Sequence, residues 1–226
     1  MRLIDTSTDR IVLIAVRHGQ SNKNLRNVNG GKGEPLTELG KKQVQDVSKQ
    51  IIEHFKDMPF VVYASPVVQA IETAEIICDQ LKKSDGVSLI QPDGVVVSDE
   101  LTPIGLGVLS GLSDEEIELN YPEYFESLSK WRKREIEACE LCIPGMELET
   151  LFERGKIFLN SIHPNAVNIV TCTRSTFVLL CNLLAGHDYH KGGGYKHIDV
   201  KNCGHATFIL CNGNIVQYAE FTDVII

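Results

Sequence analysis

The sequence predicts one α/β domain over residues 1–226, a three-layer α/β/α sandwich built on a mostly parallel central sheet. Short apolar runs are typical of strands buried on both faces, and helical patterns alternate with them along the chain. The length of 226 residues fits one large domain, and a hydrophobic content of 43% supplies side chains for a sizeable core.

The first half of the chain alternates strand and helix twice. Residues 11–16 form a continuous apolar run that predicts a buried strand. Thr37 can cap the helix that follows. The apolar residues of that helix recur on one face: Val44, Val47, Ile51 and Phe55. Residues 60–63 predict a second strand, and Pro66 suits the first turn of the next helix.

The second half begins with a helix-rich stretch over residues 113–162, which is interrupted at Pro122 and at residues 144–145. Residues 166–172 then predict a third buried strand, with a helix after it. Short strands joined by turns are expected in the tail, at residues 195–200, 205–211 and 215–220, with Asn212-Gly213 as one turn.

Charge and cysteine content limit the classes of function. The 30 acidic and 22 basic residues give a net charge of −8, which disfavours nucleic acid and anionic membranes as partners. The apolar run at residues 11–16 is too short to span a membrane. Seven cysteines, an odd number, indicate a reducing compartment, so we expect a cytoplasmic protein. Cys139 and Cys142 form a single pair without further zinc ligands, and no metal or other cofactor is expected.

Polar side chains follow the predicted parallel strands, at the sheet edge where α/β proteins bind ligands. Arg17-His18-Gly19 comes directly after the first strand, and Arg174 begins the helix after the third. A guanidinium group binds phosphoryl oxygens as a fork, and an imidazole nitrogen can attack phosphorus. These residues favour a phosphate site, although by themselves they also fit a solvated loop.

Five ordered segments resemble the histidine phosphatase superfamily, which includes the cofactor-dependent phosphoglycerate mutases. They are residues 11–40, 64–77, 101–112, 143–151 and 169–186. The resemblance implies a phosphohistidine intermediate on the nucleophile His18, with Arg17, Ser21 and Asn24 contacting the phosphorylated ligand and no metal required. Arg174, at a helix start where anions are favoured, could add a further phosphate contact.

The chain departs from the family pattern at three positions. Gln69 stands where the resemblance implies a second arginine, Pro103 where it implies the acid, and Cys172 where it implies a second histidine. Glutamine carries no charge and proline has no transferable proton, so each change removes an interaction with the phosphoryl group. At a strand end near two arginines, Cys172 is expected to have an acidified, reactive thiol; a buried inert thiol is the alternative.

Other residues of the chain could replace the acid, the arginine and the histidine that the family pattern implies. Glu100, Glu115 and Glu116 could each supply the proton that Pro103 cannot. Arg174 could take over part of the role of the missing arginine, and His205 begins a strand that could run beside the site.

Two functions follow from these observations. The combined departures favour a pseudoenzyme, which binds a small phosphorylated ligand or inorganic phosphate in the R-H-G pocket with catalysis strongly impaired or lost. The alternative is an active hydrolase or phosphotransferase that acts on a small phosphate ester through phospho-His18 with a substitute acid. Mutase activity ranks lowest, because it needs a cationic pocket for a second acidic group. A homodimer or a protein partner is left open.

Overall fold

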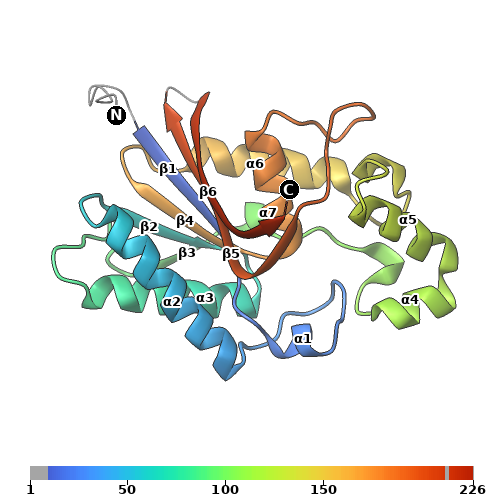
Figure 1. Cartoon of the computed structure of the whole chain (residues 1–226), viewed down its shortest axis with the longest axis horizontal. Helices are drawn as coiled ribbons and strands as arrows, with labels where there is room; N and C mark the ends of the chain where they lie inside the picture. The colour runs from blue at the N-terminus through green and yellow to red at the C-terminus, as the bar shows by residue number, and fades with distance from the viewer. Residues whose placement is uncertain (1–9, 212–213, 226) are drawn as a thin grey trace.

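The computed structural model describes residues 10–211 and 214–225 and confirms the α/β fold (Figure 1). Its strands are β1 (Arg10–Arg17), β2 (Phe60–Ala64), β3 (Val95–Val97), β4 (Val167–Cys172), β5 (Asp199–Cys211) and β6 (Asn214–Ile225). They form one sheet in the order β3-β2-β4-β1-β5-β6. Strands β1 to β4 pair in parallel, whereas β5 and β6 run antiparallel at one edge, so the sheet is mixed and mostly parallel.

Helices cover both faces of this sheet, which confirms the three predicted layers. They are α1 (Asn22–Leu25), α2 (Glu38–Phe55), α3 (Val68–Lys83), α4 (Asp114–Asn120), α5 (Pro122–Arg132), α6 (Leu148–Ser161) and α7 (Arg174–Leu184). Helices α2 and α3 lie on one face, and α6 and α7 on the other (Figure 1). Successive side chains of β1 alternate between the two layers: Val12 and Ile14 belong to the core cluster beneath α2 and α3, and Leu13 to the opposite cluster.

Local signals explain where several elements begin. The hydroxyl of Thr37 accepts the backbone N–H of Gly40 at 3.0 Å, so α2 begins at the predicted cap. Pro122 occupies the first turn of α5, where its missing N–H costs nothing. The role predicted for Pro66 is wrong, because α3 begins at Val68 and Pro66 lies in the turn before it.

The tail differs from the prediction. Two long antiparallel strands, β5 and β6, replace the expected short ones, and β5 begins only at Asp199. Pairing with β1 and β6 on its two sides extends β5 across residues whose sequence signal is interrupted. The predicted turn at Asn212-Gly213 lies outside the described residues. Strand β3 was not predicted, because three residues give no readable alternation.

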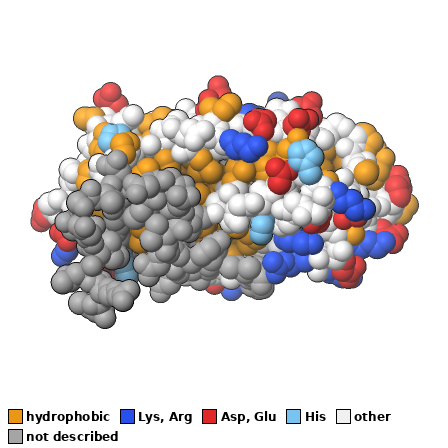
Figure 2. Space-filling model, turned by 90° about the horizontal axis from the view of Figure 1, so that it is seen from above, with side chains coloured by type: hydrophobic (Ala, Val, Ile, Leu, Met, Phe, Trp, Pro, Cys, Tyr) orange, Lys and Arg blue, Asp and Glu red, His pale blue; other side chains and the backbone are white. Residues whose placement is uncertain are grey.

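Residues 113–147, here called the cap, lie beyond the end of the sheet. They contain α4, α5 and a short 3-10 turn at Ala138–Glu140 (Figure 1). None of the described helices is long and apolar enough to cross a membrane. Figure 2 shows acidic and basic side chains interspersed over the visible part of one face of the molecule.

A close backbone contact fixes the loop that follows β1 against the start of α2. A Cβ atom on Gly19 would lie 2.6 Å from the carbonyl oxygen of Gly40, and one on Gly40 would lie 2.1 Å from that of Gln20. Both distances are far below van der Waals contact, so these two positions require glycine. The glycine of the R-H-G motif therefore lets the loop pack directly on α2.

We predict that Gly40→Ala lowers the free energy of unfolding by about 1–3 kcal/mol, because the added methyl group forces the loop and helix apart. Urea unfolding measures the change. Lys41→Ala, on the exposed side of the same helix, is the matched control and should stay within about 0.5 kcal/mol of the natural protein. Equal stability of the two variants would contradict the packing argument.

Candidate functional site

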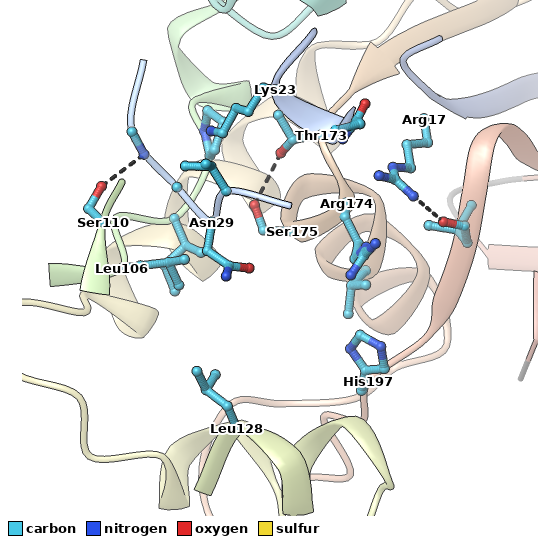
Figure 3. A pocket seen from close by; sticks show the side chains of 18 of the residues that line it. Arg17, Lys23, Asn29, Leu106, Ser110, Leu128, Thr173, Arg174, Ser175 and His197 are labelled. Carbon is cyan, nitrogen blue, oxygen red and sulfur yellow. Dashed lines mark hydrogen bonds between the residues drawn. The ribbon is translucent and has the colours of Figure 1, made fainter. Parts of the chain in front are cut away.

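A cavity of about 1380 Å³ lies where β1 and β4 end, between the sheet and the cap (Figure 3). Arg17 and His18 enter it from the end of β1, and Arg174 from the first turn of α7. The cap contributes mainly apolar side chains, among them Leu128, Trp131, Leu141 and Met146. The structure thus brings the two predicted strand ends to one cavity, as the parallel pairing of β1 with β4 requires.

The buried imidazole of His18 has a defined tautomer. Its Nδ1 lies 2.7 Å from the carbonyl oxygen of Gly19, and only 4% of the residue is exposed. A carbonyl oxygen can only accept, so Nδ1 carries the proton and Nε2 keeps its lone pair. Burial lowers the pKa of His18 to about 4, with further lowering by the charge of Arg17. At neutral pH His18 is therefore a neutral imidazole with an unprotonated Nε2, the form that can attack phosphorus.

Two guanidinium groups stand near this histidine: Arg17 is buried, at 7% exposure, and Arg174 is exposed to solvent. Arg17 donates from Nη1 to the carbonyl oxygen of Val200, while its buried Nε has no hydrogen-bond partner among the described residues. Burial and the charge of Arg174 lower the pKa of Arg17 to about 10, and partial removal from water also lowers that of Arg174. The ion pairs within residues 10–211 and 214–225 all involve other cations, although the nearby charge of Asp199 favours both guanidinium groups.

A bulge in β5 holds the backbone of His18. The register of β5 with β6 shifts between Val200 and His205. Asn202 lies on this bulge. Its side-chain Nδ2 donates to the carbonyl oxygen of His18 and to Oδ1 of Asn24, both at 3.1 Å. Strand β5, late in the sequence, thereby fixes the position of the loop that follows β1, early in the sequence.

Asn24 lines the cavity, but Ser21 does not. Ser21 is fully buried, and both its backbone N–H and its hydroxyl donate to Oδ1 of Asn24, at 3.0 and 3.1 Å. With Asn202 as a third donor, that oxygen is saturated, so Asn24 can offer a ligand only its amide N–H groups. The predicted contact of Ser21 with the ligand is not supported, because its hydroxyl orients Asn24 instead.

The three departures from the family pattern lie in different surroundings. Gln69 and Pro103 line the cavity, and Cys172 does not. Oε1 of Gln69 accepts the backbone N–H of Glu34 at 3.1 Å, so this side chain also anchors the loop before α2.

The expectation of an acidified thiol at Cys172 is wrong. The side chain is fully buried in the core cluster that includes Phe177, and its Sγ donates to the carbonyl oxygen of Val16 at 3.6 Å. Burial outweighs the charge of Arg17 and raises the pKa of the thiol. The last residue of β4 points into the core rather than toward the ligand cavity.

The structure separates the candidate substitutes. Among the three predicted carboxylates, only Glu115 lines the cavity. Glu100 accepts the hydroxyl of Ser98 at 2.6 Å outside it, and Glu116 accepts the backbone N–H of Ser113 at the start of α4. His205 faces the other way, where it lines a smaller cavity against α2.

Several cavity residues were not predicted, among them Lys23, Trp131, His197, Asp199 and Asn202. The sequence offers one signal for them, because Trp131 is the only tryptophan of the chain. His197 and the other tail residues reach the site only through the pairing of β5 with β1, which local patterns do not reveal.

Comparison with known proteins places these features in a family context. A family model described as histidine phosphatase superfamily (branch 1) matches residues 13–214. A 2,3-bisphosphoglycerate-dependent phosphoglycerate mutase of Rhizobium johnstonii is 32% identical over 123 residues, 54% of this chain and 53% of the relative. Phosphoserine phosphatase 1 of Hydrogenobacter thermophilus is 27% identical over 77% of this chain and 76% of its own length. The chain spans about half the length of the mutases that it matches.

Solved structures of low identity share the fold. A mycobacterial glucosyl-3-phosphoglycerate phosphatase superposes with a TM-score of 0.67 at 18% identity, covering 88% of this chain and 90% of that one. A phosphoserine phosphatase mutant of Entamoeba histolytica, in complex with phosphoserine, gives a TM-score of 0.66 at 22% identity over 93% and 96% of the two chains.

For Cys172 we predict no alkylation by iodoacetamide in the native protein at neutral pH, because burial keeps the thiol protonated and inaccessible. Peptide mapping should find the exposed Cys142 modified first, and Cys172 modified only after unfolding. Rapid native modification of Cys172 would show that the side chain reaches the cavity.

Stability should fall in acid because of His18. Its pKa is about 4 when folded and about 6.5 when unfolded, so the unfolded chain takes up the proton first. The stabilisation is present above pH 6.5 and is lost as the pH falls toward 4. Between pH 7 and 4.5, His18→Asn should lose about 2 kcal/mol less than the natural protein in urea unfolding. Parallel pH profiles for the two proteins would contradict the burial of a neutral imidazole.

Proposed function

The chain belongs to the histidine phosphatase superfamily, and on that premise we propose that it binds a small phosphorylated ligand, or inorganic phosphate, against His18. Arg17, Arg174 and the amide of Asn24 supply the contacts to the phosphoryl oxygens. Turnover is strongly impaired or lost, so the protein acts as a phosphate-binding pseudoenzyme.

The two guanidinium groups at the cavity, the buried one of Arg17 and the exposed one of Arg174, carry this proposal. A charged group out of water is stable only when it is paired, and the buried Arg17 takes part in none of the described ion pairs. Arg174 is exposed and also forms none of them, so both cations are available to an anion. A phosphate dianion between them would accept hydrogen bonds from both and compensate both charges. The unprotonated Nε2 of His18 adds no positive charge, but it faces the phosphorus with its lone pair.

The loss of proton transfer limits catalysis. Pro103 lines the cavity at the acid position and has no proton to give. A positioned acid contributes typically about 10²–10⁴-fold and one electrostatic donor about 10²–10³-fold. Gln69 lacks the charge of an arginine, and the buried Cys172 offers no donor in the cavity. These losses need not multiply, because groups that act together are not additive.

The proposal also covers the cellular location of the protein and its partners. We infer a cytoplasmic location, in keeping with free cysteines among the described residues. The net charge of −8 argues against nucleic acid as a partner. The relatives named as mutases suggest phosphoglycerate chemistry, yet the uncharged Gln69 leaves a second acidic group without one of its cations. A homodimer or a protein partner stays a prediction.

Inorganic phosphate should stabilise the natural protein, and Arg174→Leu should weaken its binding at least about tenfold, because a charge-assisted hydrogen bond contributes roughly 1.5–3 kcal/mol. At a hundredfold excess over the dissociation constant, binding adds about 2.7 kcal/mol and raises Tm by several degrees. Differential scanning fluorimetry and calorimetric titration measure the two effects.

The matched control is Arg134→Leu, which removes an arginine of the cap that does not line the cavity. It should leave phosphate affinity unchanged. The proposal fails if high millimolar phosphate leaves Tm of the natural protein where it was.

One observation favours a second function, hydrolysis of a phosphate ester through phospho-His18. Glu115 lines the same cavity as His18 and could protonate the leaving group. The nucleophile would form a bond from Nε2 to phosphorus while the ester oxygen leaves with the proton of Glu115. Water would then attack the phosphohistidine and release phosphate.

In that case Glu115→Gln lowers the hydrolysis rate of a phosphate ester about 10²-fold or more, because the amide cannot give up a proton. Steady-state kinetics with a chromogenic phosphate ester measure it. The neighbouring Glu116→Gln should keep the full rate, since that side chain caps α4 outside the cavity. His18→Ala must abolish the activity. Equal rates for both glutamine variants would exclude Glu115 as the acid.

A further inference from the structure

The cavity is roomy and has many apolar side chains in its lining. The whole cavity is about 1380 Å³, whereas pockets for drug-sized ligands commonly span ~300–1,000 Å³. Its apolar lining includes Leu106, Leu128, Leu141, Met146, Leu148 and Val178. Figure 3 shows Leu106 and Leu128 facing the cavity from the side opposite Arg174. A phosphate ion alone would leave this apolar surface in contact with water.

Two of the cations that line the cavity are already paired. Arg132 forms two hydrogen bonds with the carboxylate of Asp114, at 2.8 and 3.0 Å, and Lys201 pairs with Asp223 at 3.1 Å. A second acidic group on a ligand would have to compete with these carboxylates. Lys23 and Lys32 also line the cavity and form none of the described ion pairs, so the preference for a neutral group rests on the apolar side chains themselves.

Two ring nitrogens in the lining of the cavity have no hydrogen-bond partner among the described residues. Trp131 and His197 pack edge to face with ring centroids 4.7 Å apart, and both line the cavity. Within residues 10–211 and 214–225, the buried Nε1 of Trp131 and Nδ1 of His197 have no hydrogen-bond partner, and His197 is only 5% exposed. In Figure 3, His197 lies next to Arg174. A buried polar group without a partner costs roughly 1–3 kcal/mol, so an acceptor supplied by a ligand would be favoured here.

We propose that the ligand is a phosphate monoester of a bulky, largely apolar ring alcohol that carries a neutral hydrogen-bond acceptor. This inference rests on the proposed phosphate site. The phosphate binds Arg17 and Arg174 beside His18, and the ring packs against the apolar side chains of the cap. After a small rotation of the indole, Nε1 of Trp131 donates to the acceptor. Trp131 thereby determines specificity for the part of the ligand that the phosphate contacts do not reach.

The test compares four ligands by calorimetric titration: inorganic phosphate, 3-phosphoglycerate, 1-naphthyl phosphate and 4-methylumbelliferyl phosphate. The naphthyl ester offers a ring without an acceptor, and the umbelliferyl ester offers a ring with a neutral carbonyl oxygen. We expect the umbelliferyl ester to bind at least about tenfold more tightly than inorganic phosphate, with the naphthyl ester between them. The acidic 3-phosphoglycerate should gain nothing over inorganic phosphate.

Two variants assign the effect to Trp131. Trp131→Phe keeps a ring but removes the N–H, so it should abolish the preference for the umbelliferyl over the naphthyl ester. Trp131→Ala should weaken both esters and leave the affinity for inorganic phosphate unchanged. Leu119→Ala, which removes an exposed apolar side chain of the cap outside the cavity, is the control and should change no affinity.

The outcomes separate this inference from the function on which it rests. If inorganic phosphate binds but 3-phosphoglycerate binds more tightly than the ring esters, the ligand class is wrong and the phosphate site stands. The same holds if Trp131→Phe and Trp131→Ala retain the full preference of the natural protein. If neither inorganic phosphate nor any ester binds, the phosphate site itself is wrong.

Discussion

A buried guanidinium group, that of Arg17, with the charge of the more exposed Arg174 close to it, is the constraint on which the account of this site depends. Removal from water lowers the pKa of both Arg17 and Arg174, and the charge of Arg174 lowers the pKa of Arg17 further. One carbonyl oxygen, that of Val200, and the nearby charge of Asp199 offset part of the cost. Such an arrangement gains stability when an anion enters, because a single dianion compensates both cations. Binding of phosphate is thus what the electrostatics of the cavity favour most directly.

The rest of the fold keeps the nucleophile in place for that anion. Gly19 allows the loop after β1 to pack on α2, and the bulge of β5 holds the carbonyl group of His18 through Asn202. The hydrogen bond from Nδ1 to Gly19 leaves Nε2 unprotonated. None of these contacts involves the position of the missing acid, Pro103. Proline at position 103 therefore leaves the proposed phosphate site and the unprotonated Nε2 of His18 intact.

The sequence predicted what depends on local pattern and missed what depends on distant pairing. Alternating apolar runs predicted the layers, and the end of the first strand predicted Arg17 and His18. Side-chain direction at the end of β4 depends on pairing with β1, so the sequence could not decide between a reactive and a buried, inert thiol at Cys172. The contact between Trp131 and His197 joins the cap to the tail across 66 residues of sequence, which no local periodicity records. The side of the cavity lined by Trp131 and His197 was therefore invisible in the sequence, whereas the side lined by Arg17 and His18 was not.

A crystal structure of the protein with orthovanadate would test the central claim most directly. Vanadate resembles phosphate in shape and charge and can bond to a nucleophilic nitrogen. The account predicts a vanadate ion bonded to Nε2 of His18, with its oxygens accepting hydrogen bonds from both Arg17 and Arg174. Vanadate bound elsewhere at saturating concentration, or a cavity in which the two guanidinium groups contact only protein atoms, would contradict it.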